Sequence, residues 1–278
     1  MSLSTSTAKP DLEMTAWKPS ALALAFRIVS VAFLIDAGHS VVEALAADLG
    51  DFGFSLGVAT GVVSAVLGGW SCWMIAAAIA GSGPDDLPDE EALRRFLRVL
   101  AIAFIYFAVS EVSAYVDGFG LRWNGLDWAL INGQWVAVYL GTGLAIWLSA
   151  DRTFTQRGKV YLGLIQPKVL KVFGISYSAA LAFWIIWTAT SPDISLDLNS
   201  FTRFASLALL TYGFLKGSSS QRRDLAFWSV TAGFLLNLSV VQLGLSSLLG
   251  TLYLPAAGVG LLIVRAAGPS SEENLVSP

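Results

Sequence analysis

The sequence is poor in charged residues and holds a single cysteine and a single histidine. Of 278 residues, 13% are Asp, Glu, Lys or Arg, whereas 55% are hydrophobic. Cys72 alone can form neither a disulfide within the chain nor a multi-thiolate metal site. His39 alone excludes a zinc site with two histidines and a haem held by two histidines. The sequence therefore assigns no cofactor.

Features of a catalytic protein are also missing. No glycine-rich phosphate loop occurs, and the polar stretches between the apolar runs are too short to hold a catalytic domain. Ser40 follows His39 on the same expected helix, which is not a nucleophile and base arrangement with independent support. We expect no enzymatic activity, no catalytic residue and no nucleic-acid partner.

What remains is a strongly apolar chain, with a mean hydropathy of +0.66. That value lies outside the range of water-soluble domains, so we expect an all-α polytopic integral membrane protein of the cell inner (plasma) membrane, with the lipid bilayer as its first partner. About 20 apolar residues cross the hydrocarbon core of a bilayer. Eight segments approach that length: 21–48, 53–81, 93–118, 126–149, 169–190, 199–216, 225–245 and 248–265.

The basic residues orient this eight-helix arrangement. Eight spans place all but two of the seventeen Lys and Arg residues on one side, leaving Arg122 and Arg203 on the other. Because basic residues concentrate in cytoplasmic loops, we expect four helical hairpins with both termini in the cytoplasm. The expected domains are a cytoplasmic segment at 1–20, a transmembrane domain at 21–266 and a disordered cytoplasmic tail at 267–278.

Polar residues gather in the expected outer half of the bundle. Asp36, His39, Ser40 and Glu43 follow an i, i+3, i+4, i+7 pattern, which places them on one face of the first helix. Glu111 lies at a similar depth on the third helix. Ionisable side chains at such depth face the bundle interior or a water-filled cavity. The candidate binding residues are Asp36, His39, Glu43, Glu111, Asp127, Asn132 and Gln134.

These residues are compatible with three roles. They can form a satisfied hydrogen-bonded cluster that locks helix packing. They can form a proton or cation pathway, because neighbouring carboxylates share protons and a histidine can relay them. A divalent metal could use Asp36, His39, Glu43 and Glu111, but their spacing matches no established metal motif, so we assign no metal site.

Small and aromatic residues have simpler explanations. Gly68-Gly69 and Gly141-Thr142-Gly143 indicate close approach of helices. A set of deep tryptophans could line a pocket for a pigment, a quinone or a lipid tail, although packing is the commoner role of such rings: Trp70, Trp73, Trp135, Trp184 and Trp187.

Two fragments resemble microbial rhodopsins. These are Asp127-Trp128, early in a span that descends from the outside, and 256–265, at the end of the last span. The resemblance implies a seven-helix core with an extra helix at the N-terminus. The position of the retinal-binding lysine holds Ala256, and no lysine falls at membrane depth. No Schiff base can form, so the resemblance implies at most a retinal-free relative.

Two classes of function follow. The first is a non-catalytic subunit or sensor-like bundle of a larger membrane assembly, with other membrane subunits or a bound pigment or lipid as partners. The second is a proton- or cation-coupled transporter or channel for a small polar solute. Broken helices would favour transport, because discontinuous spans build substrate sites. In the sequence only Pro255 falls inside an expected span.

Overall fold

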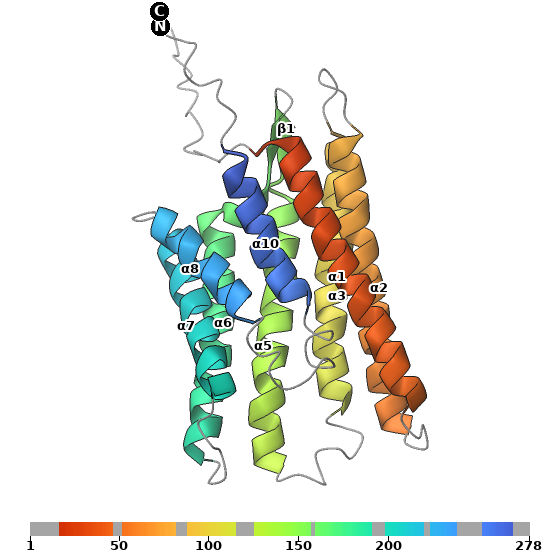
Figure 1. Ribbon diagram of the computed structural model, residues 1–278, viewed down its shortest axis with the longest axis vertical. Coiled ribbons are helices and arrows are strands. Elements are labelled where there is room, and N and C mark those ends of the chain that lie inside the picture. The colour runs from red at the N-terminus through yellow and green to blue at the C-terminus, as the bar shows by residue number, and fades with distance from the viewer. Residues whose placement is uncertain are drawn as a thin grey trace, which may run out of the picture.

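The computed structural model describes residues 17–46, 52–81, 88–114, 125–156, 159–190, 198–219, 223–237 and 252–268, which form a bundle of helices running along one direction (Figure 1). The prediction of an all-α fold is confirmed. The helices of the described residues are α1 Pro19–Ala46, α2 Phe52–Ala80, α3 Glu90–Ala114, α5 Gly125–Ala150, α6 Pro167–Thr190, α7 Leu198–Ser218, α8 Arg223–Leu236 and α10 Tyr253–Ala266.

Each helix packs against the next one in the chain, and α10 packs against both α8 and α1. The helices therefore form a closed ring. Buried residues of every long helix contribute to one continuous apolar core. Since α10 closes the ring, residues from the two ends of the chain meet inside the bundle.

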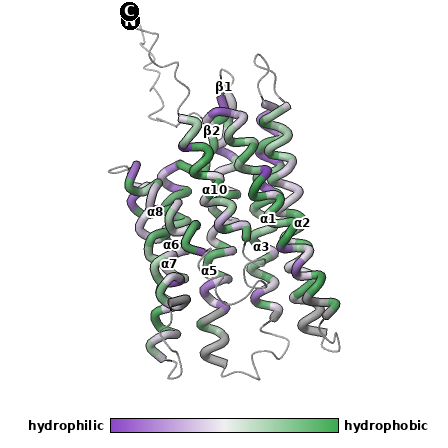
Figure 2. The backbone as a smooth tube through the Cα atoms, in the orientation of Figure 1, coloured by the Kyte–Doolittle hydropathy of each residue, from purple (hydrophilic) through white to green (hydrophobic). Residues whose placement is uncertain are grey.

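Four of the described helices, α1, α2, α3 and α6, contain stretches long and apolar enough to cross a membrane. Apolar residues run along most of the bundle (Figure 2), and this composition suggests a membrane location. The two helices of the last expected hairpin are different. At 14 residues each, α8 and α10 are about 21 Å long, shorter than a hydrocarbon core of roughly 30 Å.

The predictions of full spans at 225–245 and 248–265 are therefore not met by the described residues. The helix α8 ends at Leu236, where the prediction continued to 245, and α10 begins at Tyr253. The intervening residues 238–251 lie outside the described residues. Figure 1 shows α8 and α10 side by side in the upper half of the bundle, with the end of α8 and the start of α10 both near mid-height.

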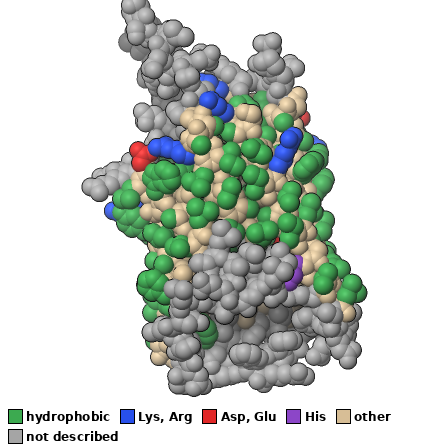
Figure 3. Space-filling model, viewed as in Figure 1, with side chains coloured by type: hydrophobic (Ala, Val, Ile, Leu, Met, Phe, Trp, Pro, Cys, Tyr) green, Lys and Arg blue, Asp and Glu red, His purple; other side chains and the backbone are tan. Residues whose placement is uncertain are grey.

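Basic residues mark one end of the bundle, which we call the basic end. It is the end where α1, α3, α6 and α8 begin, and blue Lys and Arg side chains lie toward it in Figure 3. Within the described part of the chain, Arg203 is the exception. The predicted cytoplasmic location of this end stays a prediction, as do the N-terminal segment at 1–20 and the tail at 267–278, which lie almost wholly outside the described residues.

A short β-hairpin covers the basic end. Strand β1 (Phe154–Gln156) pairs antiparallel with β2 (Lys159–Tyr161), and a 3₁₀ turn, η2, follows at Gly163–Ile165. The carboxylate of Glu90, at the start of α3, accepts a hydrogen bond from the backbone N–H of Thr155 at 2.9 Å. Two three-residue strands are too short for sequence periodicity to reveal, so this connector had no predicted structure.

Glycines allow the close helix packing that the sequence predicted. A Cβ atom at Gly141 of α5 would overlap the side chain of Ser176 in α6, and one at Gly143 would lie 2.9 Å from the carbonyl oxygen of Ala101 in α3. The Ser176 hydroxyl donates to the Ala137 carbonyl oxygen across this contact. Only glycine permits this approach of α5 to both of its neighbours.

Candidate functional site

Aromatic rings from four helices fill the centre of the bundle. Tyr253, the first residue of α10, stacks on Phe33 of α1 with ring centroids 4.7 Å apart. Phe107 of α3 stacks on Tyr139 of α5 at 5.2 Å. The Tyr253 hydroxyl donates a hydrogen bond to the Tyr139 hydroxyl at 2.9 Å, and both residues are buried. Trp135 extends the stack along α5, with its ring centroid 5.7 Å from that of Tyr139.

Two of the predicted acids reach this aromatic centre. Asp36 on α1 is 5% exposed, and Glu111 on α3 is half-buried. Both carboxyl groups interact electrostatically with Tyr139, and Asp36 also interacts with Tyr253. Asp36 is therefore buried and Glu111 partly so, while their predicted role as binding residues stays a prediction. Tyr139, on which both acids act, was not selected by the sequence analysis.

Arg203 of α7 completes the charged group. Its guanidinium carbon lies 5.0 Å from the centroid of the Trp135 ring, within the range of a cation–π contact. It interacts electrostatically with Glu111 and with Tyr139. Arg203 thus points toward α5 and lines the space between the helices. The charge count had treated it only as an exception to the basic side.

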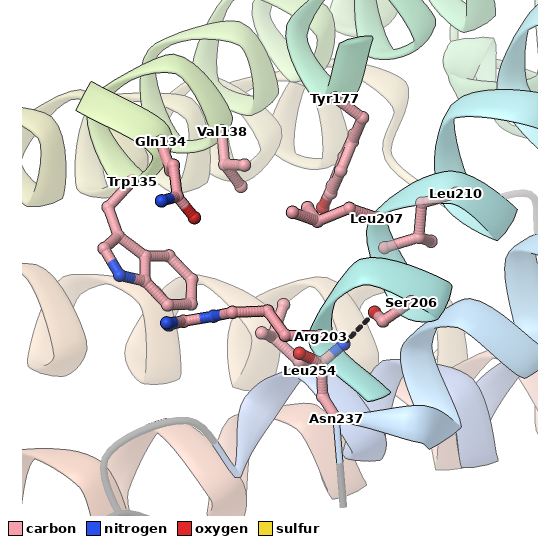
Figure 4. Close-up of a pocket in the computed structure, with 10 residues that line it drawn as sticks. All are labelled: Gln134, Trp135, Val138, Tyr177, Arg203, Ser206, Leu207, Leu210, Asn237 and Leu254. Atoms are coloured by element: carbon pink, nitrogen blue, oxygen red, sulfur yellow. Dashed lines mark hydrogen bonds between the residues drawn. The ribbon is translucent and has the colours of Figure 1, made fainter. Parts of the chain in front are cut away.

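A cavity adjoins Arg203. It lies between α5, α6 and α7, beside the C-terminal end of α8 and the N-terminal end of α10. It holds about 20 Å³ of space for the centre of a water-sized sphere, somewhat more than the ~10–15 Å³ that one water molecule needs. Residues of five segments converge on this space, as Figure 4 shows: Gln134, Trp135, Val138, Tyr177, Arg203, Ser206, Leu207, Leu210, Asn237 and Leu254.

The side-chain amide of Gln134 points into the cavity (Figure 4). Gln134 is 3% exposed, and its Nε2 atom has no hydrogen-bond partner among the residues that the structure describes. A buried polar group left without a partner costs about 1–3 kcal/mol. A group of this kind beside a cavity is therefore a natural binding atom for a ligand or an ordered water.

The end of α8 is fixed by side chains at the edge of the cavity. The Ser206 hydroxyl of α7 donates to the Gly233 carbonyl oxygen at 2.7 Å. The Asn237 amide donates to Ser206 Oγ at 2.9 Å and to the same Gly233 carbonyl at 3.0 Å. A Cβ at Gly233 would lie 2.6 Å from Leu210 Cγ. The place where α8 stops is therefore held against α7 by a hydrogen-bonded cap and tight packing.

The other predicted site residues take less central positions. His39 and Asn132 are half-buried, and each has an interaction partner. Glu43 lies in α1 and Asp127 lies in α5, but their side chains are outside the described residues. In the described part of the chain, no three His, Cys, Asp or Glu side chains come together as a metal site.

Several residues of this site were missed because the sequence signal for each is weak. An arginine early in a span is usually interpreted as a charge that flanks the membrane. The pattern around Tyr139, Tyr253 and Ser206 is typical of interfacial or packing residues. Of the deep tryptophans, Trp135 does line the cavity. Trp70 and Trp73 do not, since they expose 47% and 50% of their surface on the outside of the bundle.

The chain matches no model of a known protein family, and no curated protein or solved structure matches it either. The resemblance of two fragments to microbial rhodopsins stays a prediction. In the structure Ala256, which takes the place of the retinal-binding lysine, is buried in α10. A function for this site rests on its own residues and their geometry.

Proposed function

We propose that this protein is a transporter or channel-like membrane protein that carries a small polar solute through the cavity beside Arg203. The observation that carries the proposal is the meeting of two half-length helices at this cavity, which is lined by Asn237 at the end of α8 and by Leu254 at the start of α10. A helix that stops inside a membrane leaves backbone groups without intrahelical partners. Such ends are tolerated where they line a cavity, and they supply solute sites in many transporters.

The charged residues support the same proposal. Arg203, Glu111 and Asp36 each interact electrostatically with the buried Tyr139. Each ionisable group at membrane depth costs a few kcal/mol, so a purely structural bundle gains little from three of them. A polar path that admits a solute or a proton makes use of all three.

The test is the accessibility of the cavity from each side of the membrane. In a Cys72→Ala background, a cysteine is placed at Leu207, which lines the cavity. The matched control is a cysteine at Ala145 of α5, which is fully buried and does not line it. A small membrane-impermeant thiol reagent is applied to spheroplasts and, separately, to inverted vesicles.

Transport predicts that Leu207→Cys reacts from both sides, while Ala145→Cys reacts from neither. Reaction from one side only would contradict transport and favour the sensor-like bundle, whose site has to meet only one aqueous phase. Equal protection of both cysteines would favour the non-catalytic subunit of a membrane assembly. Purification in mild detergent then separates a solitary protein from one that retains partners or a bound pigment.

A further inference from the structure

Two groups that donate hydrogen bonds adjoin the cavity, beside the amide oxygens of Gln134 and Asn237, which can only accept. The unpartnered Gln134 Nε2 and the guanidinium of Arg203 approach it from α5 and α7 (Figure 4). Among the described residues, no carboxylate forms an ion pair with Arg203; Glu111 acts on it from a longer distance. Two donors, one of them positively charged, favour an acceptor that carries negative charge.

The backbone of α10 adds to this preference. Leu254 lines the cavity from the first turn of α10, and the residue that caps the helix, Leu252, provides no side-chain cap. The first turn of a helix carries positive partial charge from its free N–H groups. An α10 that begins at Tyr253, inside the bundle, brings this charge to membrane depth.

We propose that the cavity binds a small monovalent anion, such as chloride or formate, with Arg203 and Gln134 as its ligands. This inference rests on the proposed function, because it names the class of the transported solute. The cavity has room for about one water-sized particle, so a small ion fits it better than a retinoid or a lipid tail. A cation is disfavoured because Arg203 would repel it strongly in surroundings of low polarity.

Glu111 sets the strength of binding. Its carboxylate acts on Arg203 and so competes with an anion for the same positive charge. Glu111→Gln keeps the size of the side chain and removes the negative charge. The variant is expected to bind the anion several-fold more tightly than the native chain.

The experiment uses the full chain, purified and reconstituted in lipid nanodiscs. Sodium formate and sodium chloride are titrated against sodium gluconate of equal ionic strength, and the fluorescence of Trp135 and the other tryptophans is recorded. The native chain is expected to give a saturable change with formate or chloride. Arg203→Gln and Gln134→Glu should weaken binding by about tenfold or more, since each removes a charge-assisted contact or adds a repelling charge.

The matched control is Arg265→Gln at the basic end. Arg265 also lies over an aromatic ring, 5.6 Å from the centroid of Phe227, but it is far from the cavity. This variant should bind like the native chain. Arg203→Lys serves as a second variant that keeps the charge; it should retain weakened binding and shows whether loss in Arg203→Gln is a matter of folding.

Two results would overturn the inference: no saturable response to either anion in the native chain, or equal responses in the native chain and Arg203→Gln. The thiol experiment separates this failure from failure of the proposed function. If Leu207→Cys reacts from both sides but no anion binds, the class of solute is wrong and transport stands. If anions bind but Leu207→Cys is protected, the inference about the ligand stands and transport fails.

Discussion

Tyr253 donates a hydrogen bond of 2.9 Å to Tyr139, and this contact joins the first residue of α10 to the middle of α5. The two residues are 114 positions apart in the sequence. Both rings are buried in the aromatic stack that Phe33 and Phe107 complete. The half-length helix α10 is therefore anchored by its first residue, at the depth where Asp36 and Glu111 approach the bundle centre.

Replacing Tyr253 with phenylalanine should destabilise the bundle by about 1–3 kcal/mol, because the Tyr139 hydroxyl loses its buried partner. At roughly 2–4 °C per kcal/mol for a chain of this size, the Tm in detergent should fall by several degrees. The double variant Tyr139→Phe with Tyr253→Phe removes both hydroxyls and should recover much of the loss. A double variant that is as unstable as the sum of the two single variants would contradict this coupling.

Alanine at Gly141 should lower the Tm strongly, because its Cβ would overlap Ser176 and force α5 and α6 apart. Overpacking of this kind costs typically 1–3 kcal/mol. Gly38 of α1 provides the control, since a Cβ there meets nothing within 4 Å. Gly38→Ala should be neutral or should stabilise the helix by up to about 1 kcal/mol. Thermal unfolding of both variants in one detergent should show a lower Tm for Gly141→Ala and an unchanged or higher Tm for Gly38→Ala.

Asn237→Ala should loosen the end of α8 without unfolding the bundle. The substitution removes the hydrogen bonds to Ser206 Oγ and to the Gly233 carbonyl. Amide hydrogen exchange should become faster in the last turn of α8, while α6 keeps its protection. Ser178→Ala, which loses only a bond to Gly174 within α6, should leave exchange in α8 unchanged. If the last turn of α8 exchanges equally fast in the Asn237→Ala and Ser178→Ala variants, Asn237 does not hold the helix end.

Glu90→Ala should release the β-hairpin from α3. The Glu90 carboxylate accepts hydrogen bonds from the backbone N–H of Thr155 and from its hydroxyl. Without this acceptor, limited trypsin should cleave after Lys159 faster than in the native chain. The neighbouring Glu91 is exposed, so Glu91→Ala should be cleaved at the native rate. Equal rates in the two variants would show that the hairpin is held by other contacts.

The predicted orientation has its own test. Since basic residues favour the cytoplasmic side, a reporter fused after Pro278 should be active only in the cytoplasm. A label on a cysteine at Thr190, at the end of the bundle away from the basic residues, should be reached from outside. A periplasmic signal from the reporter would reverse the orientation and break the eight-span arrangement.

Hydropathy and the charge distribution predicted the helices of this protein well. The ends of α1, α2, α5, α6 and α7 fall within a few residues of the expected segments, because polar breaks interrupt long apolar runs there. The same reasoning extended α8 beyond Leu236 to residue 245, because apolar residues continue after the polar Asn237. It also missed the β-hairpin, whose two short strands pair with each other and are joined to α3 through Thr155 and Glu90.

By itself the sequence determined that the chain is helical and membrane-like, because long apolar runs separated by polar breaks favour membrane-spanning helices. The role of Asp36 and Glu111 as binding residues stays a prediction, which rests on the cost of charge at membrane depth. The tertiary structure alone decided what those acids meet. Closure of the ring by α10 brings Tyr253 to Tyr139, and α7 brings Arg203 to Trp135 and to the cavity of Gln134. These contacts depend on which helices become neighbours and on how closely glycines let them pack. The residue pattern along a single helix predicts neither.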